Sequence, residues 1–133
     1  MAAVSGVSYT DATAGIGSKH SYQVVALGKT AQLHSLQSKT VSAVAVCAKP
    51  KLTGRIGDSN KPELTWGQVE GAAGYAVYRS TSKTKGYKKI GEAEDTTYTD
   101  LTAKKNKTYY YKIVALADNG NSTYSSYVKL KSK

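Results

Sequence analysis

The residues that could serve as a nucleophile and its base are few in this sequence. Cys47 is the single cysteine, and His20 and His34 are the two histidines. An activated cysteine needs a histidine within hydrogen-bond reach, a third group that orients the imidazole, and a pocket. His34 lies in a predicted loop, and Cys47 ends the apolar run 44–47. We therefore interpret Cys47 as a semi-buried structural thiol, and we predict no catalytic residues and no enzyme activity.

Metal-binding patterns are equally scarce. A four-ligand structural zinc site needs more Cys and His than the three residues named above can supply. The segment 118–122 resembles the beginning of a calcium loop, but Lys129 stands where a bidentate Glu should close that loop. Turn formation explains the segment, so we expect neither a metal site nor a cofactor.

Composition and charge exclude further classes of protein. The chain has 133 residues, of which 40% are hydrophobic, enough to bury a core. Its net charge of +10 divides into +2 for residues 1–48 and +8 for residues 49–133. The lysines of the second part are scattered among turn residues, so we interpret the charge as a solvated surface and expect no nucleic acid partner. An apolar run of about 18 residues, long enough to span a membrane, is missing.

Two blocks of sequence recur with an offset of 89 residues. Residues 9–13 (YTDAT) match 98–102 (YTDLT), and 22–27 (YQVVAL) match 111–116 (YKIVAL). The earlier copy then carries two extra residues, so later matches have an offset of 87, as a variable loop between two strands allows. The chain is therefore expected to hold one complete unit, residues 49–133, and the last half of a preceding unit, residues 1–48.

The apolar positions alternate with a period of two, which is typical of strands. Tyr109, Tyr111, Ile113 and Ala115 share one parity and are expected to face a core. Turn residues separate the short strands at the spacing of a β-sandwich. The predicted strands are 51–57, 63–67, 74–80, 87–91, 96–100, 108–117 and 123–130. This pattern predicts an all-β antiparallel sandwich.

Four motifs resemble those of the fibronectin type III family, in the form common in extracellular bacterial proteins. They are LTW at 64–66, VEGAAGYAVYRS at 69–80, YTDL at 98–101 and TYYYKIVAL at 108–116. The resemblance implies a seven-stranded antiparallel immunoglobulin-like β-sandwich. It makes Trp66 a core marker and Tyr109 a tyrosine corner, whose hydroxyl bonds to nearby backbone. The earlier copy has His20 in place of that tyrosine.

The resemblance also makes residues 1–48 the fifth to seventh strands of a unit whose first four strands are missing. The apolar faces of Tyr22, Val24, Val41 and Val44 would then be exposed. We expect this chain to belong to a longer multi-domain protein. We also expect its half-unit to be ordered by strand pairing with another chain, as in a strand-complemented homo-oligomer.

The family suggests a non-catalytic extracellular spacer or interaction module of a larger surface or secreted protein. Its partners would be other domains of that protein, and its export signal would lie outside this chain, because the first ten residues lack signal-peptide features. The alternative is a module that binds carbohydrate, an anionic cell-wall polymer or a host or surface protein. Tyr78, Tyr110 and Lys112, on the outer face of the sheet, would form that binding surface.

Overall fold

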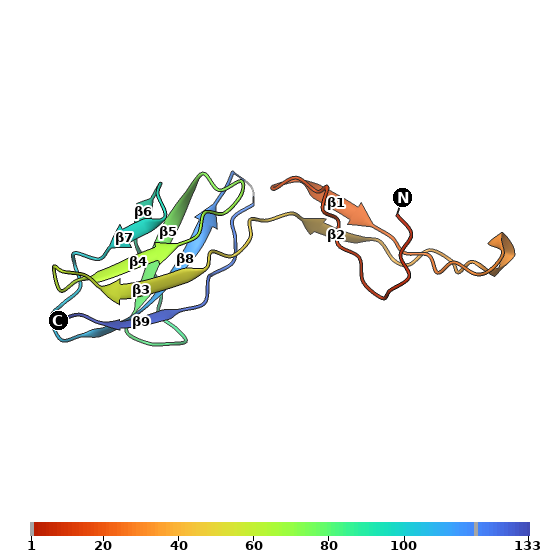
Figure 1. Ribbon diagram of the computed structural model, residues 1–133. Coiled ribbons are helices and arrows are strands. Elements are labelled where there is room, and N and C mark those ends of the chain that lie inside the picture. Colours follow the sequence, from red (N-terminus) through yellow and green to blue (C-terminus); the bar gives the residue numbers. More distant parts are fainter. Residues whose placement is uncertain (1, 119) are drawn as a thin grey trace.

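The computed structural model describes residues 2–118 and 120–133, which form short strands and one 3-10 turn (Figure 1). Asn119, in the segment considered above for calcium, lies outside the described residues. The elements are β1 (Lys19–Tyr22), η1 (Ala31–Leu33), β2 (Val41–Val44), β3 (Leu52–Ile56), β4 (Pro62–Trp66), β5 (Gly74–Ser80), β6 (Lys88–Ala93), β7 (Thr97–Thr99), β8 (Thr108–Leu116) and β9 (Val128–Lys131). No helix in this part of the chain is long and apolar enough to cross a membrane.

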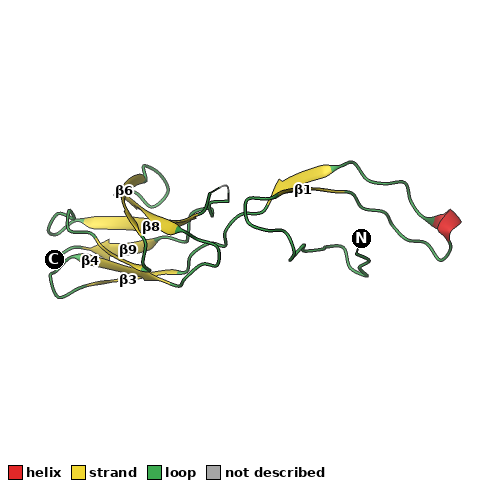
Figure 2. Cartoon of the chain, turned by 90° about the horizontal axis from the view of Figure 1, so that it is seen from above, coloured by secondary structure: helices red, strands yellow, loops and turns green. Residues whose placement is uncertain are grey.

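Strands β3 to β9 form two antiparallel sheets that face each other. One sheet has the order β3-β4-β7 and the other has the order β6-β5-β8-β9. In Figure 2 the layer with β8 and β9 lies over the layer with β3 and β4. These seven strands confirm the predicted immunoglobulin-like sandwich, because the period-two pattern places one side of every strand against the opposite sheet.

The core lies between the two sheets. Val77, Tyr111 and Ile113 are fully buried, and Leu64 keeps only 1% of its surface exposed. Trp66 packs against Tyr75 in an edge-to-face contact with 5.3 Å between ring centres. Aromatic pairs of this geometry add stability beyond the apolar area that they bury.

Cys47 also belongs to this core. Its side chain is 3% exposed, and its sulfur lies 4.0 Å from the carbonyl oxygen of Glu70. The backbone amide of Cys47 donates to the carbonyl of Gly120. These contacts fit the structural role expected for the thiol.

The strand that ends the chain begins later than the sequence predicts. We expected a strand from residue 123, whereas β9 begins at Val128. The amides of Ala115 and Ile113 donate to the side-chain oxygens of Ser122 at 2.8 Å and Ser125 at 2.9 Å. Because hydroxyl groups take the place of backbone carbonyls here, a regular ladder forms only beyond this segment.

The first part of the chain contains one antiparallel strand pair. β1 pairs with β2, with Lys19 opposite Val44 and Tyr22 opposite Val41. The fifth strand of this earlier unit, which the repeat makes the counterpart of the predicted strand 96–100, is not formed. Its counterpart in the repeat, β7, pairs with β4 in the sandwich, and residues 2–48 contain no strand equivalent to β4.

Candidate functional site

The outer side of the four-stranded sheet carries a group of tyrosines and lysines that we call the tyrosine face. It consists of Tyr78, Tyr87, Tyr110, Tyr124, Tyr127, Lys83 and Lys112. Tyr78 lies on β5, while Tyr110 and Lys112 lie on β8. The register places Tyr78 directly opposite Lys112. Since neighbouring residues of a strand point to opposite sides, these side chains point away from the core that holds Val77 and Tyr111.

One half of the tyrosine face is built around Tyr124. Its ring lies 5.0 Å from the ring of Tyr78, with the two planes perpendicular, and 6.2 Å from that of Tyr87. The Lys112 ammonium lies 4.4 Å from the centre of the Tyr87 ring and 5.4 Å from that of Tyr124. Such cation–π contacts hold the lysine over the aromatic surface.

The other half pairs Tyr110 with Tyr127. Their ring centres are 5.6 Å apart, and the ammonium of Lys83 lies 5.3 Å from the centre of the Tyr127 ring. The structure therefore brings Tyr78 and Lys112 into one half of the face and Tyr110 into the other. The surface expected from the sequence did not include Tyr124 or Tyr127, which the structure adds to it.

Two tyrosine hydroxyls of this face, those of Tyr87 and Tyr124, have raised pKa values and remain protonated at neutral pH. Burial raises the pKa of Tyr87, with nearby Tyr110 and Tyr127 adding to the effect. Burial and Tyr78 likewise raise the pKa of Tyr124. Tyr124 is nevertheless 43% exposed and Tyr127 is 39% exposed. The face thus offers accessible aromatic rings, hydroxyl groups and two lysine side chains, which suit stacking and hydrogen bonding with a polar ligand.

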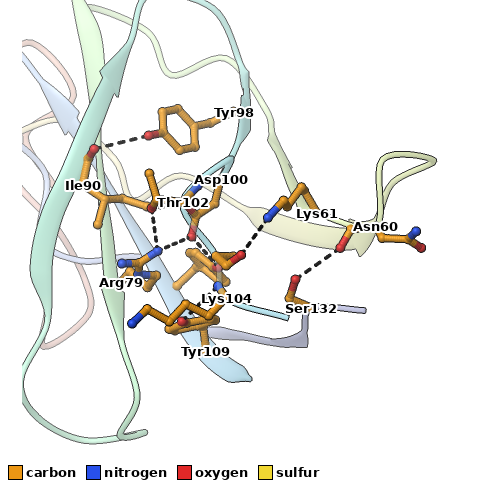
Figure 3. Close-up of polar contacts among 12 residues, drawn as sticks. Asn60, Lys61, Arg79, Ile90, Tyr98, Asp100, Thr102, Lys104, Tyr109 and Ser132 are labelled. Carbon is orange, nitrogen blue, oxygen red and sulfur yellow. Dashed lines mark hydrogen bonds and ion pairs between the residues drawn. The ribbon is translucent and has the colours of Figure 1, made fainter. Parts of the chain in front are cut away.

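A second polar cluster surrounds Asp100, directly after β7 (Figure 3). This carboxylate is 1% exposed and accepts hydrogen bonds from Arg79 at 2.7 Å and from the Tyr111 hydroxyl at 2.8 Å. The amide and hydroxyl of Thr102 donate to its other oxygen at 3.0 and 2.7 Å. Burial alone would raise the pKa of Asp100, but the bonds from Arg79, Thr102 and Tyr111 outweigh it and hold the pKa below its ordinary value. Both oxygens are engaged, so the cluster serves as a structural anchor.

Tyr109 forms the expected tyrosine corner beside this anchor. Its ring is 5% exposed, and its hydroxyl accepts a hydrogen bond from the amide of Lys104 at 3.2 Å (Figure 3). The guanidinium carbon of Arg79 lies 4.7 Å from the centre of the same ring. His20, at the equivalent place in the earlier copy, instead lies 2.8 Å from the hydroxyl of Ser18.

The described ranges hold no candidate metal site. Three or more His, Cys, Asp or Glu side chains arranged to hold a metal ion are not found within residues 2–118 and 120–133. Cys47 contacts a backbone carbonyl and His20 contacts a serine hydroxyl. The tyrosine face is therefore the surface that we carry forward as the candidate site.

Comparison with known proteins gives matches over part of the chain. No family model matches. An amylopullulanase from Thermoanaerobacter thermohydrosulfuricus is 33% identical over 69 residues, which make up 51% of this chain and 5% of that protein. An amylopullulanase from Thermoanaerobacterium saccharolyticum is 35% identical over 66 residues, again 5% of its length.

Solved structures give matches of similar extent. An Fn3-like protein from Clostridium thermocellum superposes with a TM-score of 0.61 and 30% identity, covering 65% of this chain and 94% of that one. A pectate lyase from Pectobacterium carotovorum gives a TM-score of 0.56 and 30% identity, covering 62% of this chain and 27% of that one.

Proposed function

The chain belongs to the fibronectin type III family, and from this premise we propose that it is a non-catalytic spacer or interaction module of a larger extracellular protein. The observation that carries the proposal is the difference in coverage between two kinds of relative. The match extends over 94% of a small Fn3-like protein but over only 5% of the amylopullulanases. Such coverage is expected when one module recurs both alone and within long enzymes.

The names of the relatives suggest the kind of parent protein. Amylopullulanases and a pectate lyase are carbohydrate-active enzymes by name, and each contains a segment similar to this chain. We propose that the parent protein acts on polysaccharide outside the cell and that this module links or spaces its domains. Its other domains would be the main partners, as expected from the sequence.

Assays with soluble starch, pullulan and pectate test the non-catalytic assignment. The purified chain should release no reducing ends above a blank with any of these substrates. The variant Asp100→Asn distinguishes genuine activity from contamination, because we expect it to weaken the fold and any activity of the chain should fall with it. Turnover that co-purifies with the wild-type chain and falls in the variant would contradict the proposal.

A second candidate function is carbohydrate binding by the tyrosine face. The specific observation in its favour is that Tyr124 and Tyr127 remain exposed while other tyrosines and two lysines hold them in place. Aromatic rings on a sheet can stack on sugar rings, and their hydroxyls can bond to sugar hydroxyls. The two ammonium groups would instead favour an anionic polymer.

Native gel electrophoresis with polysaccharide in the gel separates these ligands. We expect pullulan to retard the wild-type chain at both low and high salt, and Tyr124→Ala to abolish the retardation. Tyr9→Ala is the matched control, because Tyr9 is 58% exposed in the other part of the chain. Retardation by pectate that disappears at high salt and in Lys112→Ala would assign the face to an anionic polymer instead. Unretarded migration with both polymers would refute the second candidate and leave the spacer function standing.

A further inference from the structure

The Asp100 anchor has a nearly complete duplicate in the first part of the chain. Asp11 accepts hydrogen bonds from the Thr13 amide at 2.9 Å, the Thr13 hydroxyl at 2.6 Å and the Tyr22 hydroxyl at 3.0 Å. Each bond has its equivalent at Asp100, displaced by the offset of 89 residues. The sequence repeat is therefore also a repeat of side-chain contacts.

The strand pairs are duplicated as well. β1 and β2 pair in the register of β8 and β9, so that Tyr22 opposite Val41 corresponds to Tyr111 opposite Val128. The unusual serine contacts recur too. The amide of Val24 donates to the hydroxyl of Ser38, and the amide of Ala26 donates to the hydroxyl of Ser35. The amides of the two serines donate in turn to the carbonyls of Val24 and Ala26. Their counterparts are the contacts of Ile113 and Ala115 with Ser125 and Ser122.

Within residues 2–48 the first copy has no strands that correspond to β3, β4, β5 and β6. Asp100 pairs with Arg79 from β5, whereas Asp11 has no cationic partner within the described residues. Val24 is 70% exposed, although its counterpart Ile113 is fully buried. The duplicated contacts therefore lie beside an apolar face and a carboxylate that lack the strands that cover Ile113 and Asp100 in the second copy.

The free edge of β1 indicates how the cover would attach. β8 lies between β5 and β9. Backbone groups alternate in direction along a strand, and the amides of Val24 and Ala26 point toward the β2 side. Those of Gln23 and Val25 therefore point to the edge that β5 occupies in the complete unit. An unpaired edge of this kind is a template for strand addition.

We propose that β1 and β2 are the acceptor for a segment built like residues 49–90 of this chain, located ahead of them in the same polypeptide. A β5-type strand of this segment adds to the free edge of β1, and its arginine pairs with Asp11. Only residues 94–96 separate β6 from β7. By the repeat, the covering segment should connect to the 9–13 block through an equally short loop. A second copy of this chain is a poorer source, because its own β3 to β6 are already engaged. This inference does not depend on the proposed function.

The test compares the chain with an extended form in which a copy of residues 49–90 replaces Met1. With the offset of 89, residue 2 corresponds to Gly91, so in the extended form it follows a copy of Ile90, as Gly91 does in the complete unit. Hydrogen exchange at Gln23 and Val25 should be at least about 100-fold slower in the extended form. Val24 and Ala26 serve as controls, because their amides are already bonded within the pair. Equal exchange at Gln23 and Val25 in both forms, with the extension folded, would overturn the proposal.

A coupling measurement tests the arginine. In the extended form, Asp11→Asn should accelerate exchange at Val25 at least about tenfold. Asp11→Asn should have no effect on exchange at Val25 when the added copy carries Arg79→Met. If Asp11→Asn accelerates exchange equally with and without Arg79→Met, the proposed ion pair between Asp11 and the added arginine is refuted.

The unextended chain supplies a test that does not require the extension to fold. Gel filtration with light scattering should show a monomer whose Gln23 and Val25 amides exchange rapidly. A dimer that protects these amides would assign the face to a second copy, and a monomer that protects them would show that the face needs no cover. Either result would overturn the proposal.

Discussion

Replacing Asp100 by Asn should remove a large part of the stability of the sandwich. Asn keeps one oxygen to accept from Thr102, but it presents an amide to Arg79 and Tyr111, which both donate to Asp100. Hydrogen bonds to charged groups contribute about 1.5–3 kcal/mol each, so the two losses cost about 3–6 kcal/mol. Breaking a buried ion pair by removing one partner costs a similar amount. A domain of this size has a free energy of unfolding of about 5–10 kcal/mol, so roughly half of it would be lost.

Denaturant unfolding followed by Trp66 fluorescence measures this loss. Trp66 is the single tryptophan and is 4% exposed in the core, so its signal reports on the sandwich alone. Asp11→Asn is the matched control, because Asp11 makes the same contacts with Thr13 and Tyr22 but has no arginine and lies outside the sandwich. We expect a much lower midpoint for Asp100→Asn and an unchanged midpoint for the control. Equal midpoints for the two variants would refute the role assigned to the Asp100 anchor.

Three further predictions follow from buried contacts. The depressed pKa of Asp100 contributes stability that is present above pH 3.8 and lost as the pH falls through the lowered pKa; the unfolding midpoint should fall in acid for the wild type, and less for Asp100→Asn. Ser125→Ala leaves the buried Ile113 amide without its acceptor and should cost about 1–3 kcal/mol in urea unfolding, whereas Ser38→Ala should leave the Trp66 transition unchanged. Trp66→Ala should cost about 3–5 kcal/mol and leave the domain largely unfolded; cooperative thermal melting, seen by circular dichroism within a few degrees of the wild type, would contradict this.

The sequence was sufficient to predict the sandwich, because period-two alternation and turn residues act locally. The strand β5 (Gly74–Ser80) was predicted with its observed bounds. Tyr109 was recognised as a tyrosine corner through the resemblance to the fibronectin type III family, and the structure supplies its partner, the Lys104 amide five residues away.

Contacts between distant segments could not be predicted in the same way. The Arg79–Asp100 pair joins residues 21 positions apart. Arg79 lies on β5 in one sheet, and Asp100 directly follows β7 in the other. The late start of β9 depends on serine hydroxyls that replace carbonyl acceptors, and strand propensity does not reveal such a substitution. That irregular segment also determines where Tyr124 and Tyr127 lie, so sequence reasoning found only part of the tyrosine face.

Residue-resolved hydrogen exchange of the 133-residue protein tests the central claim most directly, namely that the chain joins one self-supporting module to an open half of another. The account predicts slow exchange at the bonded amides of β5 and β8 and rapid exchange at Gln23 and Val25, in a protein that is monomeric. Equal protection of both parts of the monomer would contradict it.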